Sequence, residues 1–132
     1  MALPDLFSKG NTKVRGKRVI QKVAAVNQAL SIPANCLVTD IYFRNRTANA
    51  VTGGIKIGST AGGTDIVAAQ AVAASAASIA RVSFHTGSAA KVMYIDAVTS
   101  WNGAVVDIYF EYVEIAARTD PNASLLDAEA VQ

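Results

Sequence analysis

The 132-residue sequence is poor in the residue types that form covalent cross-links and metal centres. It has one cysteine, Cys36, so no internal disulfide can form, and the neighbouring Leu37 and Val38 favour a small buried thiol over a reactive one. It has one histidine, His85, which excludes metal sites with two histidine ligands. We therefore expect neither a metal site nor a cofactor.

Long apolar runs are missing as well. No stretch of the chain approaches the ~20 apolar residues of a membrane span, and the start of the chain, with Pro4 and Asp5, does not resemble a signal peptide. We expect no membrane partner and no secretion through a signal peptide. The N-glycosylation patterns at Asn45 and Asn122 then imply no glycan.

Motifs for catalysis and for phosphate binding are incomplete. A phosphate-binding P-loop needs a lysine after its glycines, whereas the glycine-rich stretch 58–65, GSTAGGTD, contains none and ends in Asp65. Ser83, His85 and an aspartate can be combined into a nucleophilic set on paper, but nothing in the sequence brings them together. We predict that the protein is not an enzyme.

Charge is unevenly placed along the chain, although the net charge is only +2. Residues 1–22 carry six cations and one acid, a net of +5, so the rest of the chain carries −3. We predict an extended basic arm at 1–17, one β-sandwich domain at 18–116 and an extended acidic tail at 117–132. The arm lacks interleaved aromatic residues, so a protein partner is favoured over nucleic acid.

Alternating apolar and polar residues, separated by turn-forming clusters, predict many short antiparallel strands. The pattern is clearest in the last strand, where Val106, Ile108, Phe110 and Tyr112 share one face. We expect strands in 18–28, 36–45, 53–59, 78–84, 91–98 and 104–115. This spacing is typical of an antiparallel sandwich or barrel.

The segment 36–45 alternates so that one face holds Leu37, Thr39, Ile41 and Phe43, with Val38 on the opposite face.

The alanine-rich segment 66–78 is ambiguous, because alanine is the best helix former. Its apolar residues fit strand alternation about as well as a helical stripe, and strands and turns surround it. We favour two strands that are broken near residues 73–75.

Two groups of residues are candidates for ligand binding. Trp101 and Asn102 lie in a predicted loop. An exposed indole beside a nearby acid such as Asp96 is suited to binding a sugar ring. Alternatively, the tryptophan packs over the end of the sandwich and binds no ligand. Acidic side chains on predicted outward faces indicate either a calcium or sugar site or, more simply, a solvated face: Asp96, Asp107, Glu111 and Glu114.

Two segments, TDIYFRNRTANAVTGGIKIGSTAGGTDIVAAQAV (39–72) and MYIDAVTSWNGAVVDIYFEY (93–112), resemble small β-sandwich structural proteins of tailed-bacteriophage virions. The recurring elements of that group correspond here to Asn45–Val51, Gly53–Gly58 and Gly62–Ala68. The resemblance covers roughly residues 37–113 and carries no set of catalytic residues.

The resemblance implies an all-β fold, an antiparallel β-sandwich of jelly-roll type. The charge pattern adds the extended N- and C-terminal arms, which the resemblance does not cover. It also implies a virion protein, assembled in the host cytoplasm, that decorates or cements the phage capsid by bridging subunits of the major capsid protein. We expect it to self-associate as a dimer or trimer. A carbohydrate-binding module or a tail- or fibre-associated module is the alternative.

We expect the capsid contact to come from apolar and cationic side chains at the start of the chain: Leu6, Phe7, Lys9, Lys13, Arg15, Lys17 and Arg18.

Overall fold

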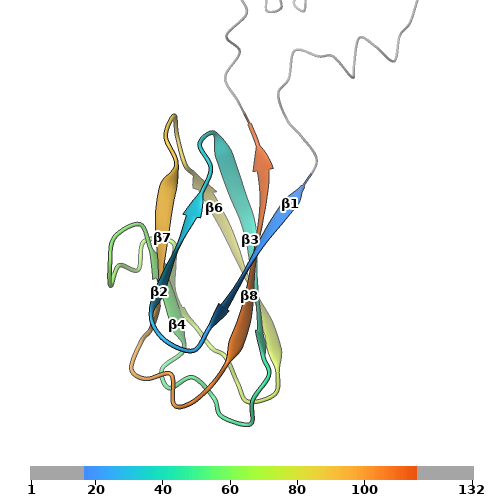
Figure 1. Cartoon of the computed structure of the whole chain (residues 1–132), viewed down its shortest axis with the longest axis vertical. Coiled ribbons are helices and arrows are strands. Elements are labelled where there is room, and N and C mark those ends of the chain that lie inside the picture. The colour runs from blue at the N-terminus through green and yellow to red at the C-terminus, as the bar shows by residue number, and fades with distance from the viewer. Residues whose placement is uncertain (1–16, 116–132) are drawn as a thin grey trace, which may run out of the picture.

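The computed structural model describes residues 17–115 and contains, within that range, eight β-strands and no helix. The strands follow one another through short turns and loops, as Figure 1 shows. Their bounds are β1 Arg18–Ala24, β2 Gln28–Ile32, β3 Cys36–Asn45, β4 Ile55–Gly58, β5 Val67–Gln70, β6 Ala77–His85, β7 Lys91–Ala97 and β8 Val106–Glu114. The prediction of an all-β, antiparallel protein is confirmed.

The strands form two antiparallel sheets of four strands each. One sheet has the order β1-β8-β3-β6 and the other β2-β7-β4-β5. In each sheet the outer pairings join strands from the two halves of the chain: β1 with β8, β3 with β6, β2 with β7 and β4 with β5. The first four strands are therefore each paired with one of the last four, in reverse order.

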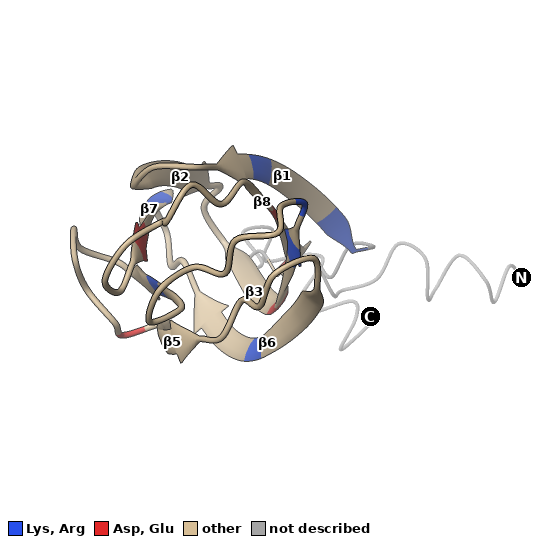
Figure 2. Cartoon of the chain, turned by 90° about the horizontal axis from the view of Figure 1, so that it is seen from below, with Lys and Arg blue, Asp and Glu red and all other residues tan. Residues whose placement is uncertain are grey.

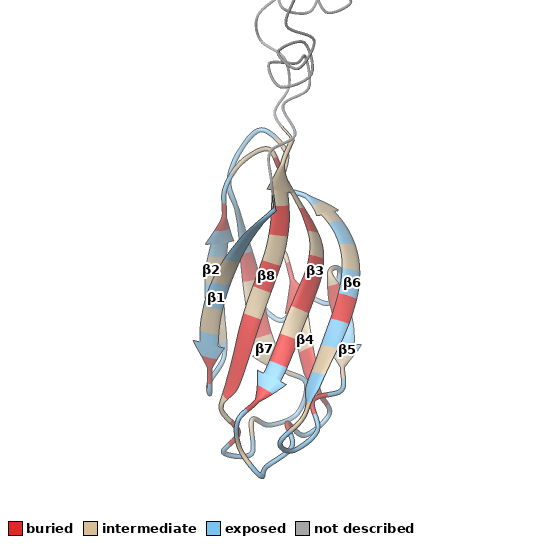
Figure 3. Ribbon diagram, turned by 90° about the vertical axis from the view of Figure 1, so that its right-hand side faces the viewer, coloured by how far each residue is buried: buried red, intermediate tan, exposed pale blue. Residues whose placement is uncertain are grey.

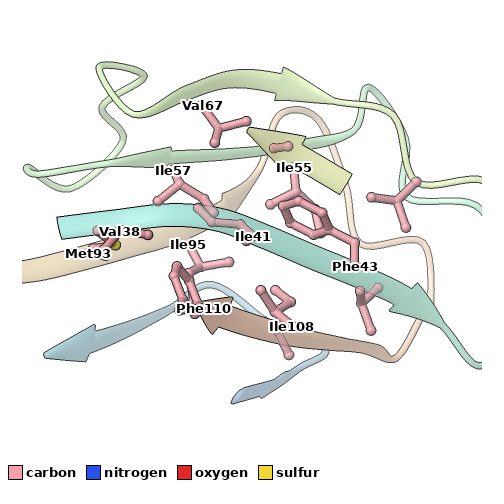
Figure 4. Close-up of a cluster of buried hydrophobic side chains, with 14 of the residues drawn as sticks. Val38, Ile41, Phe43, Ile55, Ile57, Val67, Met93, Ile95, Ile108 and Phe110 are labelled. Carbon is pink, nitrogen blue, oxygen red and sulfur yellow. The ribbon is translucent and has the colours of Figure 1, made fainter. Parts of the chain in front are cut away.

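The core lies between the two sheets, and both sheets contribute buried side chains to it. In Figure 3 buried and less buried residues alternate along β8 and β3, as expected for strands with one face covered. Figure 4 shows Phe43 and Phe110 of one sheet near Ile55, Ile57 and Ile95 of the other. Aromatic and β-branched side chains thus fill the interior, and the predicted core face of β8 is confirmed.

A β-bulge in β3 overturns part of the predicted alternation. The register of β3 with both neighbours shifts between Val38 and Asp40. The extra residue turns Val38 to the same side as Ile41 and Phe43, and all three are fully buried, whereas Leu37 and Thr39 are only half-buried. The prediction that Val38 lies opposite Ile41 was wrong, because strict alternation fails wherever a bulge adds a residue.

The predicted single strand over 18–28 was also wrong. β1 ends at Ala24, and after the short connection 25–27 the chain enters β2, which belongs to the other sheet. Continuous β-branched and apolar residues cannot distinguish one long strand from two strands that cross between sheets.

The alanine-rich segment 66–78 contains no helix. β5 ends at Gln70, and the chain then passes through a turn at residues 74–75 before β6 begins at Ala77. Ser75 has φ 51°, and its amide donates to the carbonyl of Thr47 at 2.8 Å. The predicted break near 73–75 is confirmed.

The two ends of the described chain lie next to each other. Arg18 at the start of β1 is in register with Tyr112 near the end of β8, so both ends leave from one end of the molecule (Figure 1). The connections 46–54 and 98–105 lie at the opposite end. The predicted arms at 1–17 and 117–132 fall outside the described residues, except for Lys17.

Candidate ligand-binding groove

Trp101 lies in the connection between β7 and β8, at the end of the molecule away from the start of β1 (Figure 1). Its indole Nε1 donates a hydrogen bond of 2.7 Å to Oδ1 of Asn27. The same oxygen accepts a bond of 3.1 Å from the backbone amide of Ala97. Asn27 therefore fixes the indole against the end of β7, and the half-buried ring also packs on the core.

Asn102 serves mainly to form the turn. It adopts a left-handed conformation with φ 53°, which asparagine tolerates better than most residues. Its backbone amide donates to Oγ of Ser100 at 3.0 Å, and its Nδ2 donates to the carbonyl of Ala50 at 3.1 Å. The bond to Ala50 ties the loop that holds Trp101 to the neighbouring loop at the same end.

Two adjoining depressions meet at Asn27 and Ala97, and we call them together the Tyr94–Trp101 groove. One measures about 610 Å³ and is lined by Asn27, Gln28, Ala29, Lys56, Ala61, Gly62, Tyr94, Asp96 and Ala97. The other measures about 590 Å³ and is lined by Ala25, Val26, Asn27, Ala97, Thr99, Ser100, Trp101 and Asn102. The groove runs from the outer face of β2-β7-β4 to the loop of Trp101.

Tyr94 occupies the centre of this sheet face. It is in register with Ala29 on β2 and with Gly58 on β4, so neither neighbouring strand places a bulky side chain beside it. Asp96 is in register with Lys56. An aromatic ring with small residues on both neighbouring strands thus lies next to one carboxylate and one ammonium group.

The glycine-rich loop 59–66 forms one wall of the groove. A Cβ atom at Gly58 would lie 2.4 Å from the backbone carbon of Gly63, so only glycine lets the loop fold back this closely on β4. The amide of Gly62 donates to Oδ2 of Asp96 at 2.9 Å. The glycines therefore shape a wall around Asp96.

Asp65 closes this loop. Its two carboxylate oxygens accept bonds from Ser59, one from Oγ at 2.6 Å and one from the backbone amide at 2.8 Å. Hydrogen bonds to the charged form favour ionisation, so those from the Ser59 side chain and backbone lower the pKa of Asp65 below its ordinary value of 3.8.

The predicted acidic candidates do not form one site. Asp107 and Glu111 lie on the other sheet from Asp96. Asp107 is 4% exposed, and Arg46 donates to both of its oxygens at 2.6 and 2.8 Å, so the prediction of a solvated Asp107 was wrong. Arg46 covers the carboxylate of Asp107 through a bidentate ion pair, and neighbouring residues of the sheet cover the rest of the side chain. Within residues 17–115 no three His, Cys, Asp or Glu side chains are grouped to hold a metal ion.

Glu111 interacts with both the phenol of Tyr42 and the ammonium of Lys17. It accepts a hydrogen bond of 3.2 Å from the Tyr42 hydroxyl and lies 3.7 Å from the ammonium of Lys17. Desolvation, followed by the nearby charge of Glu111, raises the pKa of Tyr42.

The surroundings of Cys36 and His85 indicate structural roles for both side chains. Cys36 is 2% exposed, and burial, followed by the charge of Glu114, raises the pKa of its thiol, as expected for an inert core cysteine. His85 is exposed, and its Nδ1 accepts a bond of 3.0 Å from the amide of Gly87 in the next turn. No described helix is long and apolar enough to cross a membrane.

The predicted capsid-contact residues are mostly outside the described range. Lys17 pairs with Glu111, and Arg18 is exposed at the start of β1. Figure 2 shows the described charges spread over several strands. On β1 the cations are Arg18 and Lys22. The remaining five candidates precede residue 17: Leu6, Phe7, Lys9, Lys13 and Arg15.

Sequence reasoning identified Trp101 and Asp96 but missed the residues between them. Asn27 lies in the short connection between β1 and β2, which the sequence analysis placed inside a strand. Tyr94 and Lys56 belong to outward faces, and only the order of strands brings them together. The available signal for Asn27 was its residue type, because asparagine favours turns and lies near the end of the segment 18–28.

No protein-family model matches the chain, and the comparisons with curated proteins and with solved structures give no significant match. The resemblance to virion proteins therefore stays a prediction.

Proposed function

We propose that the protein is a non-enzymatic structural subunit of a phage virion, which decorates or cements the capsid by bridging subunits of the major capsid protein. One observation carries the proposal most directly. Both ends of the described chain leave side by side from one end of a two-sheet domain (Figure 1), so both flanking segments start from the same place. Such a domain can be held at one end while the opposite loops face away.

The strand order supports a jelly-roll topology. Each of the first four strands pairs with one of the last four in reverse order, and the sheets read β1-β8-β3-β6 and β2-β7-β4-β5. Jelly rolls of eight strands in two sheets are common among viral capsid domains. Because one topology serves many functions, the strand order supports the proposal without carrying it alone.

The outer face of the sheet β1-β8-β3-β6 is the surface we propose for contact with a neighbouring protein. It exposes Val19 and Val23 of β1 and Ile79 of β6, with exposed fractions of 55%, 41% and 48%. Tyr42 and Tyr109 lie in register between these edges. Apolar and tyrosine side chains on an exposed sheet face suit the centre of a protein interface.

Ion pairs on this face hold its charges in place. Arg46 pairs with Asp107, Arg81 with Asp40 at 3.4 Å, and Lys17 with Glu111. We infer that the cationic segment at 1–17, with Leu6 and Phe7, adds contacts to the acidic surface of a neighbouring subunit. Many symmetric copies on a shell would multiply the affinity of each weak contact. Self-association as a dimer or trimer is part of the same proposal.

The test is co-sedimentation of the purified protein with expanded shells assembled from the major capsid protein encoded in the same genome. Removing residues 1–17 is expected to abolish binding while leaving the circular dichroism of a folded β-domain. Replacing Lys9, Lys13 and Arg15 with Gln is expected to weaken binding at least about tenfold at low salt, because exposed charges act over about a Debye length.

A matched control replaces Lys56 and Lys91 with Gln, since these cations lie on the other sheet. This control is expected to bind shells like the unaltered protein. If the truncated protein decorates shells as tightly as the whole one, the arm does not mediate attachment; if no variant binds shells, the proposed function is wrong.

A further inference from the structure

We propose that the Tyr94–Trp101 groove is a carbohydrate-binding site that takes one or two pyranose rings of a saccharide. The groove lies on the sheet β2-β7-β4-β5 and at the loop end, away from the ends of the described chain. This inference is therefore independent of capsid attachment. In an attached virion protein, such a groove would face away from the shell.

The aromatic side chains supply the apolar part of the site. Tyr94 is half-buried: the small Ala29 lies on its β2 side, and the 59–66 loop folds over Gly58 on its β4 side. Trp101 lies at the other end of the same groove. The C–H faces of pyranose rings pack well on aromatic rings, whose faces carry partial negative charge. Two aromatic residues joined by a polar stretch match the alternation of apolar faces and hydroxyl groups in a saccharide.

Polar groups between the two aromatic residues supply hydrogen bonds. Asp96 accepts one bond from Gly62 through Oδ2, and no other bond to Asp96 forms within residues 17–115. Its Oδ1 can therefore accept from a sugar hydroxyl. Lys56 and the Nδ2 of Asn27 can donate, because the described bonds of Asn27 use only its Oδ1. Sugars need both donors and acceptors, and this set provides both.

The site is held in shape before any ligand arrives. The bond from Trp101 to Asn27 fixes the indole, and Asp65 fixes the loop whose Gly62 amide positions Asp96. Groups held in place lose less conformational freedom on binding, so their contacts contribute more to affinity. A loop that needed to fold around the ligand would lack these internal bonds.

The balance of charge favours a sugar over an ion. Asp96 and Lys56 lie in register and oppose each other in sign, so the groove attracts neither anions nor cations strongly. A cation would also need more ligands than one free carboxylate oxygen. Neutral polyhydroxylated rings are the ligands that such a surface recognises best.

The full chain contains a single tryptophan, Trp101, so its fluorescence reports on the groove directly. The full-length protein is labelled and applied to an array of microbial and host glycans, and each positive glycan is titrated against the fluorescence and the indole N–H resonance of Trp101. We expect at least one glycan to shift both signals with a saturable curve.

Tyr94→Ala is expected to weaken binding about tenfold or more, through loss of the ring contact. Asp96→Asn keeps the shape and is expected to weaken binding several-fold through loss of a charged acceptor. The control Tyr109→Ala removes a tyrosine from the outer face of the other sheet and should leave glycan binding unchanged. Asp96→Asn also tests the site if Tyr94→Ala fails to fold.

Several results would overturn this inference. One is that no glycan on the array shifts the Trp101 signals. Another is that Asp96→Asn binds as tightly as the unaltered protein, or that Tyr109→Ala loses as much affinity as Tyr94→Ala. Binding of a peptide ligand at Tyr94 with no glycan binding would assign the groove to a protein partner instead. Shell binding is measured separately, so each proposal can fail without the other.

Discussion

The hydroxyl of Thr86 holds together the end of the domain from which both chain ends leave. Thr86 is 1% exposed, its Oγ1 accepts a bond of 3.0 Å from the amide of Cys36, and it donates a bond of 2.8 Å to the carbonyl of Pro33. The adjacent Asn35 links Gly87 to Ile115 through its amide and carbonyl. Replacing Thr86 with Val keeps the shape of the side chain but removes both of its hydrogen bonds.

The expected cost follows from the two backbone groups that would lose their partner. A buried donor or acceptor left unpaired costs about 1–3 kcal/mol, or about 2–6 kcal/mol for two. Because the bond to Pro33 is only part-buried, Thr86→Val should lower the free energy of unfolding by about 2–4 kcal/mol, in the lower part of this range. Thr86→Ser keeps the hydroxyl and removes one methyl group, which costs about 1 kcal/mol. The difference between the two variants isolates the hydrogen bonds from the packing.

Urea unfolding, followed by the fluorescence of Trp101 and by circular dichroism, measures both changes. With a slope of roughly 2 kcal/mol per M, Thr86→Val should shift the midpoint down by about 1–2 M, and Thr86→Ser by about half a molar. The reasoning is refuted if Val is within about 0.5 kcal/mol of the unaltered protein, or if Ser destabilises as much as Val.

Three further predictions concern the loop wall and the core thiol. Gly58→Ala should cost about 1–3 kcal/mol in urea unfolding and expose the 59–66 loop to proteolysis, because its Cβ would meet the backbone of Gly63; unchanged stability and proteolysis would contradict the close packing. The pKa of Asp65 is lowered in the folded protein, so its contribution to stability is present above pH 3.8 and is lost as the pH falls through the folded value. The free energy of unfolding, measured against pH, should show this loss in the unaltered protein and not in Asp65→Asn. Parallel pH dependences of the two proteins would exclude this contribution. Cys36 should react slowly with a thiol reagent at pH 8 in the native protein and rapidly in urea, whereas equal rates would show that the thiol is accessible.

The sequence pattern was sufficient to predict which residues are buried in strands that have one covered face. In β8 and β7 the predicted inward residues Val106, Ile108 and Phe110, and Met93 and Ile95, are all buried, and Asp107 is the one outward residue of β8 that is buried as well. Strand alternation and the surrounding strands and turns also located the break between β5 and β6. Local chemistry of this kind does not depend on which strands become neighbours.

Features that depend on the pairing of distant segments could not be predicted from the local sequence pattern. The bulge in β3 forms against β8 and β6, and so the inward turn of Val38 has no signature within its own strand. The burial of Asp107 depends on Arg46 from a different segment. The groove assembles Tyr94, Lys56 and Asn27 from three segments, and one-dimensional spacing holds no information about that arrangement.

Electron cryomicroscopy of the intact virion tests the proposed role most directly. We predict density for this two-sheet domain on the outer surface of the shell, with the start of β1 and the end of β8 toward the capsid and the loop of Trp101 facing outward. A domain docked through the Trp101 loop, or particles that contain no copy of the chain, would contradict the proposal.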